Sequence, residues 1–148
     1  MAVELTAVLP QTVAYGQNVL FTETPVRCNK GYVVHREGAG IVTLRGICCQ
    51  CRARYQVSFG GNIAIADGGT VDEISVAIAI DGEPLPSTTM IVTPAAVGDF
   101  FNVSNTTFID VPCGCCVTIA VENVSITDDG TAIPIDVANA NLVIERVA

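Results

Sequence analysis

The stretch EISVAIAIDGEPLP, from Glu73 to Pro86, alternates large apolar residues with small or polar ones and then enters a turn at Asp81 and Gly82. The C-terminal stretch NANLVIERVA, from Asn139 to Ala148, alternates in the same way. A period of two places successive side chains on opposite faces of a β-strand, so both stretches are predicted to be strands with one buried face. On the first of them the predicted core face consists of Ile74, Val76, Ile78 and Ile80.

The rest of the chain has the composition of a sheet protein. Half of its 148 residues are hydrophobic, Trp is absent, and no long window repeats apolar residues at helical spacing behind a capping signal. Turn signals built from Gly, Pro and Asp divide the chain into short pieces. They predict strands near residues 3–8, 12–22, 31–36, 40–46, 51–65, 73–81, 87–93, 100–111, 115–124 and 140–147. Many strands without helical crossovers predict an all-β antiparallel sandwich or jelly roll.

The predicted strand from Arg52 to Ala66 indicates which residues form the core. Apolar side chains at every second position are expected to point inward, whereas the polar side chains between them face outward. We expect a bulge or kink at Gly60 and Gly61, after which Ile63 resumes the alternation. The inward-facing residues before the glycines are Ala53, Tyr55, Val57 and Phe59.

The two stretches quoted first resemble the C-terminal jelly-roll domain of collagen-like spore-surface glycoproteins, a branch of the tumour-necrosis-factor and complement-head superfamily. Chains of that branch also place a strand before a Gly-x-Pro-x-Pro-like turn and finish on an Ile-Glu-Lys/Arg-Val-Ala strand. The resemblance implies an antiparallel jelly-roll β-sandwich that forms a homotrimer and displays surfaces. It covers residues 31–148, although this chain has no collagen-like Gly-X-Y segment. We therefore expect one compact domain, with an N-terminal arm carrying early strands at residues 1–30 and a jelly-roll head at residues 31–148.

The run VTPAAVGDFFNVSNTTFIDVPCGCC, from Val92 to Cys116, resembles uncharacterised proteins of gut Firmicutes and their phages. It points to a phage particle or a bacterial surface as the setting. We expect a non-enzymatic, homotrimeric structural protein on the virion surface, such as a capsid decoration or head-fibre protein docked to a larger particle. Two alternatives remain open. One is a host receptor- or glycan-binding module that uses the loops at residues 67–72 and 127–134, and the other is a subunit of a spore or cell-surface appendage.

Charge is distributed unevenly along the chain. The net charge is −8, yet every basic residue except Arg146 precedes residue 55. Arg27, Lys30 and Arg36 are predicted to form a basic patch that anchors the protein to an acidic partner, and a solvated surface is the plainer interpretation of these charges. The acidic balance argues against nucleic acid as a ligand. The N-terminus has no signal-peptide pattern and no run reaches about 18 apolar residues, so we expect synthesis in the cytoplasm and no membrane span.

Seven cysteines give the strongest chemical signal in the sequence. C-x-C spacing argues against zinc, because neighbouring positions on an extended strand point to opposite faces. Disulfides between subunits and reduced, buried thiols are both open interpretations. The jelly-roll resemblance implies that the two clusters lie at opposite ends of the barrel, too far apart for a disulfide within one chain. The clusters are Cys48, Cys49 and Cys51 in ICCQC and Cys113, Cys115 and Cys116 in PCGCC, and Cys28 stands alone.

Catalysis and cofactor binding have little support in the sequence. His35 is the only histidine, and on a predicted strand it is more often a structural residue than a general base. No G-x-S-x-G, P-loop or H-E-x-x-H motif occurs. Acidic loops at residues 67–73 and 128–129 have oxygen ligands of the kind that calcium prefers, but an Asp-Asp-Gly turn needs no ion. We expect no enzyme, no metal and no cofactor.

Aromatic residues are the candidates for the trimer interface, because exposed apolar surface is usually covered by self-association. Phe100 and Phe101 are adjacent, so one of them is expected to enter the core while the other points outward. The candidate interface residues are Tyr55, Phe100, Phe101 and Phe108.

Overall fold

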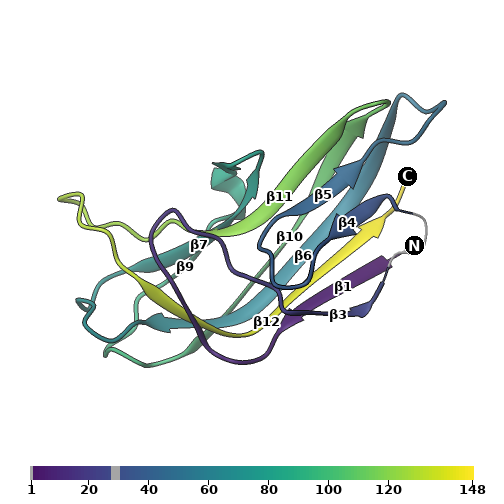
Figure 1. Cartoon of the computed structure of the whole chain (residues 1–148). Coiled ribbons are helices and arrows are strands. Elements are labelled where there is room, and N and C mark those ends of the chain that lie inside the picture. The colour runs from purple at the N-terminus through teal and green to yellow at the C-terminus, as the bar shows by residue number, and fades with distance from the viewer. Residues whose placement is uncertain (1, 28–30) are drawn as a thin grey trace.

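A computed structural model describes residues 2–27 and 31–148 and shows two antiparallel sheets packed face to face (Figure 1). The first sheet has the order β10 (Phe101–Pro112), β6 (Arg52–Ile65), β12 (Ile135–Arg146), β1 (Ala2–Ala7) and β3 (Glu23–Val26), and β2 (Gln11–Val13) also pairs with β12. The second has the order β4 (Val33–His35), β5 (Val42–Arg45), β11 (Cys116–Asn123), β7 (Ile74–Ile80) and β8 (Glu83–Pro84), and β9 (Met90–Val92) also pairs with β7. A short 3-10 turn, η1, spans Pro86–Thr88. The predicted all-β antiparallel sandwich is confirmed.

Alternation along β6 and β7 sets the core as predicted. The inward residues of β6 before the glycines are buried, and the polar residues between them are half-buried. On β7 the predicted core face is buried up to Ile78, and Ser75, Ala77 and Ala79 on the opposite face are buried too. Thr88, in η1, covers part of β7, because its hydroxyl accepts a hydrogen bond from the backbone N–H of Ile78 at 2.9 Å. The small residues on β7 leave room for this close approach.

The irregularity expected at Gly60 and Gly61 lies in the neighbouring strand instead. β6 stays paired with β10 through both glycines. The register of β12 against β6 shifts between Ala138 and Asn141, where Asn139 has a φ of 53°. Asn tolerates this left-handed backbone better than most residues do. The bulge therefore belongs to β12, where an Asn occupies the strained position.

The N-terminal segment that was expected to precede the head as an arm is built into the first sheet. β1 lies between β12 and β3, with Leu5 opposite Leu142. Alternate residues of β1 are apolar and buried, so the strand completes the core. The strand predicted at residues 12–22 is reduced to β2 and a bridge between Asn18 and Glu122. β12 begins at Ile135, ahead of the predicted start, because the bulge lets it continue past Asn139.

A buried asparagine at the end of β11 ties three segments of the chain together. The side-chain amide of Asn123 donates to the carbonyl oxygens of Val13 and Ile133, both at 2.9 Å. Its side-chain oxygen accepts from the N–H of Ser125 at 2.9 Å, and its backbone N–H donates to the carbonyl of Gln17 at 3.0 Å. Asn123 is fully buried, and its hydrogen bonds satisfy it in that environment.

Candidate functional site

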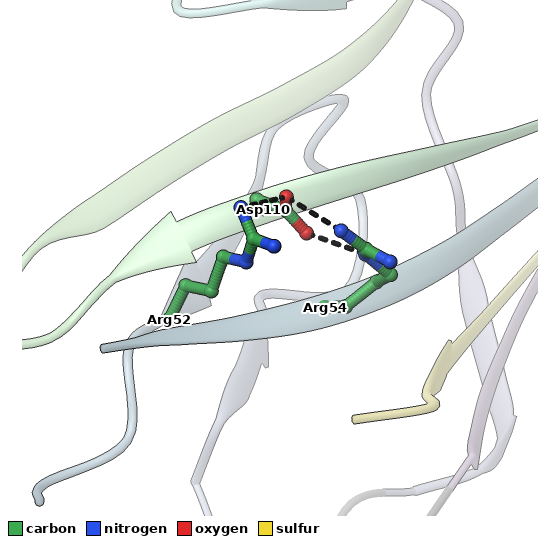
Figure 2. Close-up of polar contacts among 3 residues, drawn as sticks. All are labelled: Arg52, Arg54 and Asp110. Carbon is green, nitrogen blue, oxygen red and sulfur yellow. Dashed lines mark hydrogen bonds and ion pairs between the residues drawn. The ribbon is translucent and has the colours of Figure 1, made fainter. Parts of the chain in front are cut away.

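An ion pair occupies one end of the outward face of β6 and β10. Arg54 lies opposite Asp110 in the register of these strands. Arg54 Nε donates to Asp110 Oδ1 at 2.8 Å, and Arg54 Nη2 donates to Asp110 Oδ2 at 3.0 Å (Figure 2). The guanidinium therefore binds the carboxylate through two hydrogen bonds. Arg52 Nη1 lies 3.4 Å from the same carboxylate. The hydrogen bond from Arg54 lowers the pKa of Asp110 below its ordinary value.

Beyond this ion pair, the outward pairs that β6 makes with β10 carry no charge. Their side chains are hydroxyls, amides, glycine and one phenylalanine. The hydroxyls of Ser58 and Thr106 are 3.0 Å apart, and the Asn102 amide donates to Asn62 Oδ1 at 3.2 Å. These bonds cross from one strand to the other. The uncharged pairs are Gln56 with Phe108, Ser58 with Thr106, Gly60 with Ser104, and Asn62 with Asn102.

Phe108 is the large apolar residue of this face. Its side chain is 60% exposed and lies on β10, at the edge of the first sheet. Together with Arg54 and Asp110 it lines a hollow of about 230 Å³. An exposed aromatic beside a neutral polar surface is the composition typical of the centre of a protein–protein interface. The interface prediction for Phe108 therefore stands as a hypothesis with a defined location.

The other aromatic candidates are placed differently. Tyr55 is fully buried and its hydroxyl donates to the carbonyl oxygen of Arg45 at 2.5 Å, so its prediction as an interface residue is wrong. Side chains along β6 alternate between the core and the outward face, and this alternation points the Tyr55 side chain into the core. Phe100 and Phe101 are 44% and 42% exposed, so neither enters the core. Phe100 precedes β10, and the first core residue of that strand is Val103.

The two cysteine clusters lie side by side at one end of the sandwich, which corrects the expectation that they occupy opposite ends (Figure 1). The loop between β5 and β6 meets the turn between β10 and β11, because β6 starts where its neighbour β10 ends. The N–H of Cys113 donates to the carbonyl of Cys51 at 3.2 Å, and the N–H of Gly46 donates to the carbonyl of Cys115 at 2.9 Å. A Cβ at Gly46 would lie 2.1 Å from the carbonyl oxygen of Pro112, so the two segments are in close contact.

The six clustered cysteines are exposed free thiols, and the interpretation that they are buried apolar residues is wrong for them. Five of them lie in the loop between β5 and β6 and in the turn between β10 and β11, and Cys116 is the first residue of β11. Cys28 lies outside the described residues. The six residues are Cys48, Cys49, Cys51, Cys113, Cys115 and Cys116.

The predicted basic patch is only partly described by the structure. Arg27 forms an ion pair with Glu37 at 2.7 Å, and both side chains are largely exposed. Arg36 is exposed and lines, together with these two residues, a hollow of about 510 Å³. Lys30 lies outside the described residues. An anchoring role for Arg27, Lys30 and Arg36 stays a prediction.

His35, which also lines this hollow, has the hydrogen bonds of a structural residue. Its Nε2 lies 2.9 Å from the carbonyl oxygen of Ala39, which can only accept, so Nε2 carries the proton. Nδ1 lies 3.4 Å from the hydroxyl of Thr24. The ring also packs edge-on against Phe21, with centroids 6.5 Å apart. These contacts fix the position of the imidazole.

In the acidic loop at residues 127–134, the Asp129 carboxylate is hydrogen bonded to residues of the same loop. The Asp129 carboxylate accepts hydrogen bonds from the hydroxyls of Thr127 and Thr131, which lower its pKa. The N–H of Ala66 donates to the carbonyl of Pro134 at 3.2 Å, so the two predicted glycan loops start from neighbouring points of the first sheet. In the described part of the chain, no three residues among His, Cys, Asp and Glu are grouped as a metal site would require. Over those same residues, no helix has the length and apolar character needed to cross a membrane.

Strand register brings Arg54 to Asp110, and Cys51 to Cys113, across more than fifty residues of sequence. Neither pairing was found from the sequence. The β6 and β10 segments were both predicted as strands, but their neighbour relation and offset were not. Once the offset between two neighbouring strands is known, opposite charges at facing positions would predict an ion pair such as Arg54 with Asp110.

Comparison with known proteins assigns the fold. No protein-family model and no curated protein sequence matches the chain. The globular domain of zebrafish complement 1qA has a TM-score of 0.65 at 12% identity, covering 99% of this chain and 97% of that one. Eiger TNF from S. frugiperda has a TM-score of 0.68 at 11% identity, covering 100% and 92%. Murine APRIL at pH 5.0 has a TM-score of 0.56 at 14% identity, covering 91% and 96%. The chain therefore has the jelly-roll fold of these complement 1qA and TNF domains, as the resemblance of its two alternating stretches implied.

Proposed function

We propose that the protein is a non-enzymatic structural protein that forms a homotrimer through the outward face of β6 and β10 and is displayed on a phage particle. The observation that carries the proposal is the exposure of Phe108 on a sheet face where it lies between the Arg54–Asp110 ion pair and the uncharged pairs that follow along the strands. Homotrimer formation is what the resemblance to the superfamily implies. The exposed face of β6 and β10 is the surface that we propose for this contact.

Burial of this face against another copy is favourable on physical grounds. Burying a phenylalanine side chain fully contributes about 1.5–3 kcal/mol, and a closed ring of three copies repeats that gain at each contact. The hydroxyls of Ser58 and Thr106 hydrogen bond to each other, so their removal from water costs little. Arg54 and Asp110 neutralise one another at the end of the face. The contact would thus bury an aromatic residue without leaving either partner of that ion pair alone.

The interface is tested by replacing Phe108 with Asp and measuring molar mass by size-exclusion chromatography with light scattering. The wild-type protein is expected at three times the chain mass of 15.4 kDa. Phe108→Asp is expected to dissociate into monomers at low micromolar concentration. The matched control is Ile91→Asp, because Ile91 is 57% exposed but lies on β9 of the second sheet. Trimers in Phe108→Asp together with monomers in Ile91→Asp would place the interface on the other sheet and reject the proposed face.

Display on a phage particle is supported by the resemblance of residues 92–116 to phage and Firmicutes proteins. Arg36, exposed beside the Arg27–Glu37 pair, would contribute positive charge toward an acidic particle surface together with Lys30.

Immuno-electron microscopy tests this setting. Gold-labelled antibodies against the purified protein are expected to bind the outside of intact phage particles from a culture that produces it. Label on spores or cell surfaces, with bare particles, would favour the appendage alternative. Specific binding on a glycan array, lost when the loops at residues 67–72 and 127–134 are altered, would favour the receptor-binding alternative.

A further inference from the structure

The cysteine clusters at the end of the sandwich contain one pair of thiols in the position of a cross-strand disulfide. We propose that Cys51 and Cys113 form a reversible disulfide within one chain, which locks the start of β6 to the end of β10. The bond lies inside a single copy of the protein, so it is independent of the trimer and of any particle. It is also separate from the sheet face that carries Phe108.

Cys51 and Cys113 lie immediately beyond the last pair of the ladder between β6 and β10. The ladder ends with Arg52 opposite Pro112, and the N–H of Cys113 then donates to the carbonyl of Cys51 at 3.2 Å. Directly opposite residues of a hydrogen-bonded antiparallel pair have Cα atoms about 5.5 Å apart. A disulfide spans Cα separations of roughly 4.4–6.8 Å. Alternation places both side chains on the same side of the sheet, opposite to the side of Arg52.

The contact between the two segments holds this pair in place. Gly46 lies against the backbone of Pro112, and a side chain there would be only 3.3 Å from Cα of Cys113. Its N–H donates to the carbonyl of Cys115 at 2.9 Å. The loop and the turn are therefore anchored to each other before any covalent bond forms, which lowers the entropy lost when the sulfurs join.

The other clustered thiols lack an opposite cysteine. Cys116 lies opposite Arg45 in the register of β5 and β11. Cys115 is joined through its carbonyl oxygen to Gly46. Cys49 sits in the loop with a φ of 67°, outside any strand ladder. The geometry thus selects one pair among the six exposed thiols.

Oxidation requires an acceptor, and a small-molecule disulfide such as oxidised glutathione supplies it. One cysteine loses its proton and its thiolate attacks a sulfur of the glutathione disulfide, which releases one glutathione thiolate. The second cysteine thiolate attacks the mixed disulfide, forms the S–S bond between Cys51 and Cys113, and releases the second glutathione. Two protein thiols are oxidised and one glutathione disulfide is reduced to two thiols. Excess reduced glutathione reverses both steps.

The test compares two full-length variants with matched numbers of thiols. One keeps only Cys51 and Cys113, the other keeps only Cys49 and Cys115, and serine replaces every other cysteine. The clustered thiols are exposed, so serine should preserve the fold, and circular dichroism of the reduced forms checks this. Both variants are incubated with oxidised glutathione and analysed by intact mass, non-reducing gels and thermal melting.

The Cys51/Cys113 variant is expected to lose about 2 Da as a single chain, without bound glutathione. The bond closes a loop of about 60 residues, so its Tm should rise by about 10 °C over the reduced form. The Cys49/Cys115 variant should instead carry glutathione adducts and show no such rise. Glutathione adducts on the first variant, cross-linked dimers of it, or an unchanged Tm would overturn the proposal. If the reduced variants do not fold, peptide mapping of oxidised wild-type protein decides, and any pairing other than Cys51 with Cys113 rejects the inference.

Discussion

Replacing Asn123 with Asp is expected to destabilise the protein strongly, because the change removes both donors of a buried amide. The amide nitrogen of Asn123 donates one hydrogen to the carbonyl of Val13 and the other to the carbonyl of Ile133, each at 2.9 Å. Asp has nearly the same shape, but an ionised carboxylate offers only acceptors. Its second oxygen would therefore face two carbonyl oxygens in a site that is fully buried.

The size of the effect follows from the groups that lose a partner. Each buried carbonyl left without its donor costs about 1–3 kcal/mol, and two are affected, so the free energy of unfolding should fall by about 2–6 kcal/mol. That is a large share of the roughly 5–15 kcal/mol typical of a folded domain. At roughly 2–4 °C per kcal/mol for a chain of this length, Tm should fall by about 4–24 °C. Burial raises the pKa of the new carboxyl, and its protonation at low pH restores one donor, so the loss should shrink as the pH falls.

Urea unfolding followed by circular dichroism measures this free energy. Asn105→Asp is the matched control, because it adds the same charge at a half-buried position on β10 and should cost much less. If Asn123→Asp unfolds within about 0.5 kcal/mol of the wild-type protein, the hydrogen bonds of Asn123 do not hold these segments and the reasoning is refuted.

Two further substitutions test the strand contacts near the cysteine end. Gly46→Ala should lower Tm, since its new Cβ would lie 2.1 Å from the carbonyl oxygen of Pro112, and a Tm equal to that of the wild-type protein would contradict the close contact. The hydrogen bond from Arg54 lowers the pKa of Asp110 in the folded state. The ionised carboxylate therefore stabilises the folded protein at pH values above the unfolded pKa of about 3.9. This stabilisation is lost as the pH falls through the lower pKa that Asp110 has in the folded state. Thermal melts should therefore place wild type above Asp110→Asn near neutral pH and bring the two together in strong acid, and a gap that does not change with pH would contradict this.

Local patterns predicted the strands and the core, because a strand with one buried face alternates apolar and polar residues along the sequence. The alternation that buries Val57 and Phe59 on β6 is visible within a few positions. It also indicated that Tyr55 belongs to the core, and the structure agrees with that pattern and not with the interface role assigned to Tyr55. The bulge at Asn139 was missed because two glycines opposite it gave a stronger local signal than one asparagine.

Relations between distant strands could not be predicted in this way. Arg54 and Asp110 are 56 residues apart, and their ion pair depends on which strands are neighbours and on the offset between them. The same offset brings Cys51 to Cys113. A shift of one residue would turn every side chain on the strand to the opposite face, so residue types alone do not give the contacts. The cysteine end was misplaced for this reason, although both segments that form it were recognised.

Native mass spectrometry of the wild-type protein tests most directly whether three copies of the chain assemble, which the proposed contact through the outward face of β6 and β10 requires. The expected ion series corresponds to three times 15.4 kDa at low micromolar concentration. A protein that stays at the mass of one chain from low to high micromolar concentration would contradict the proposed assembly.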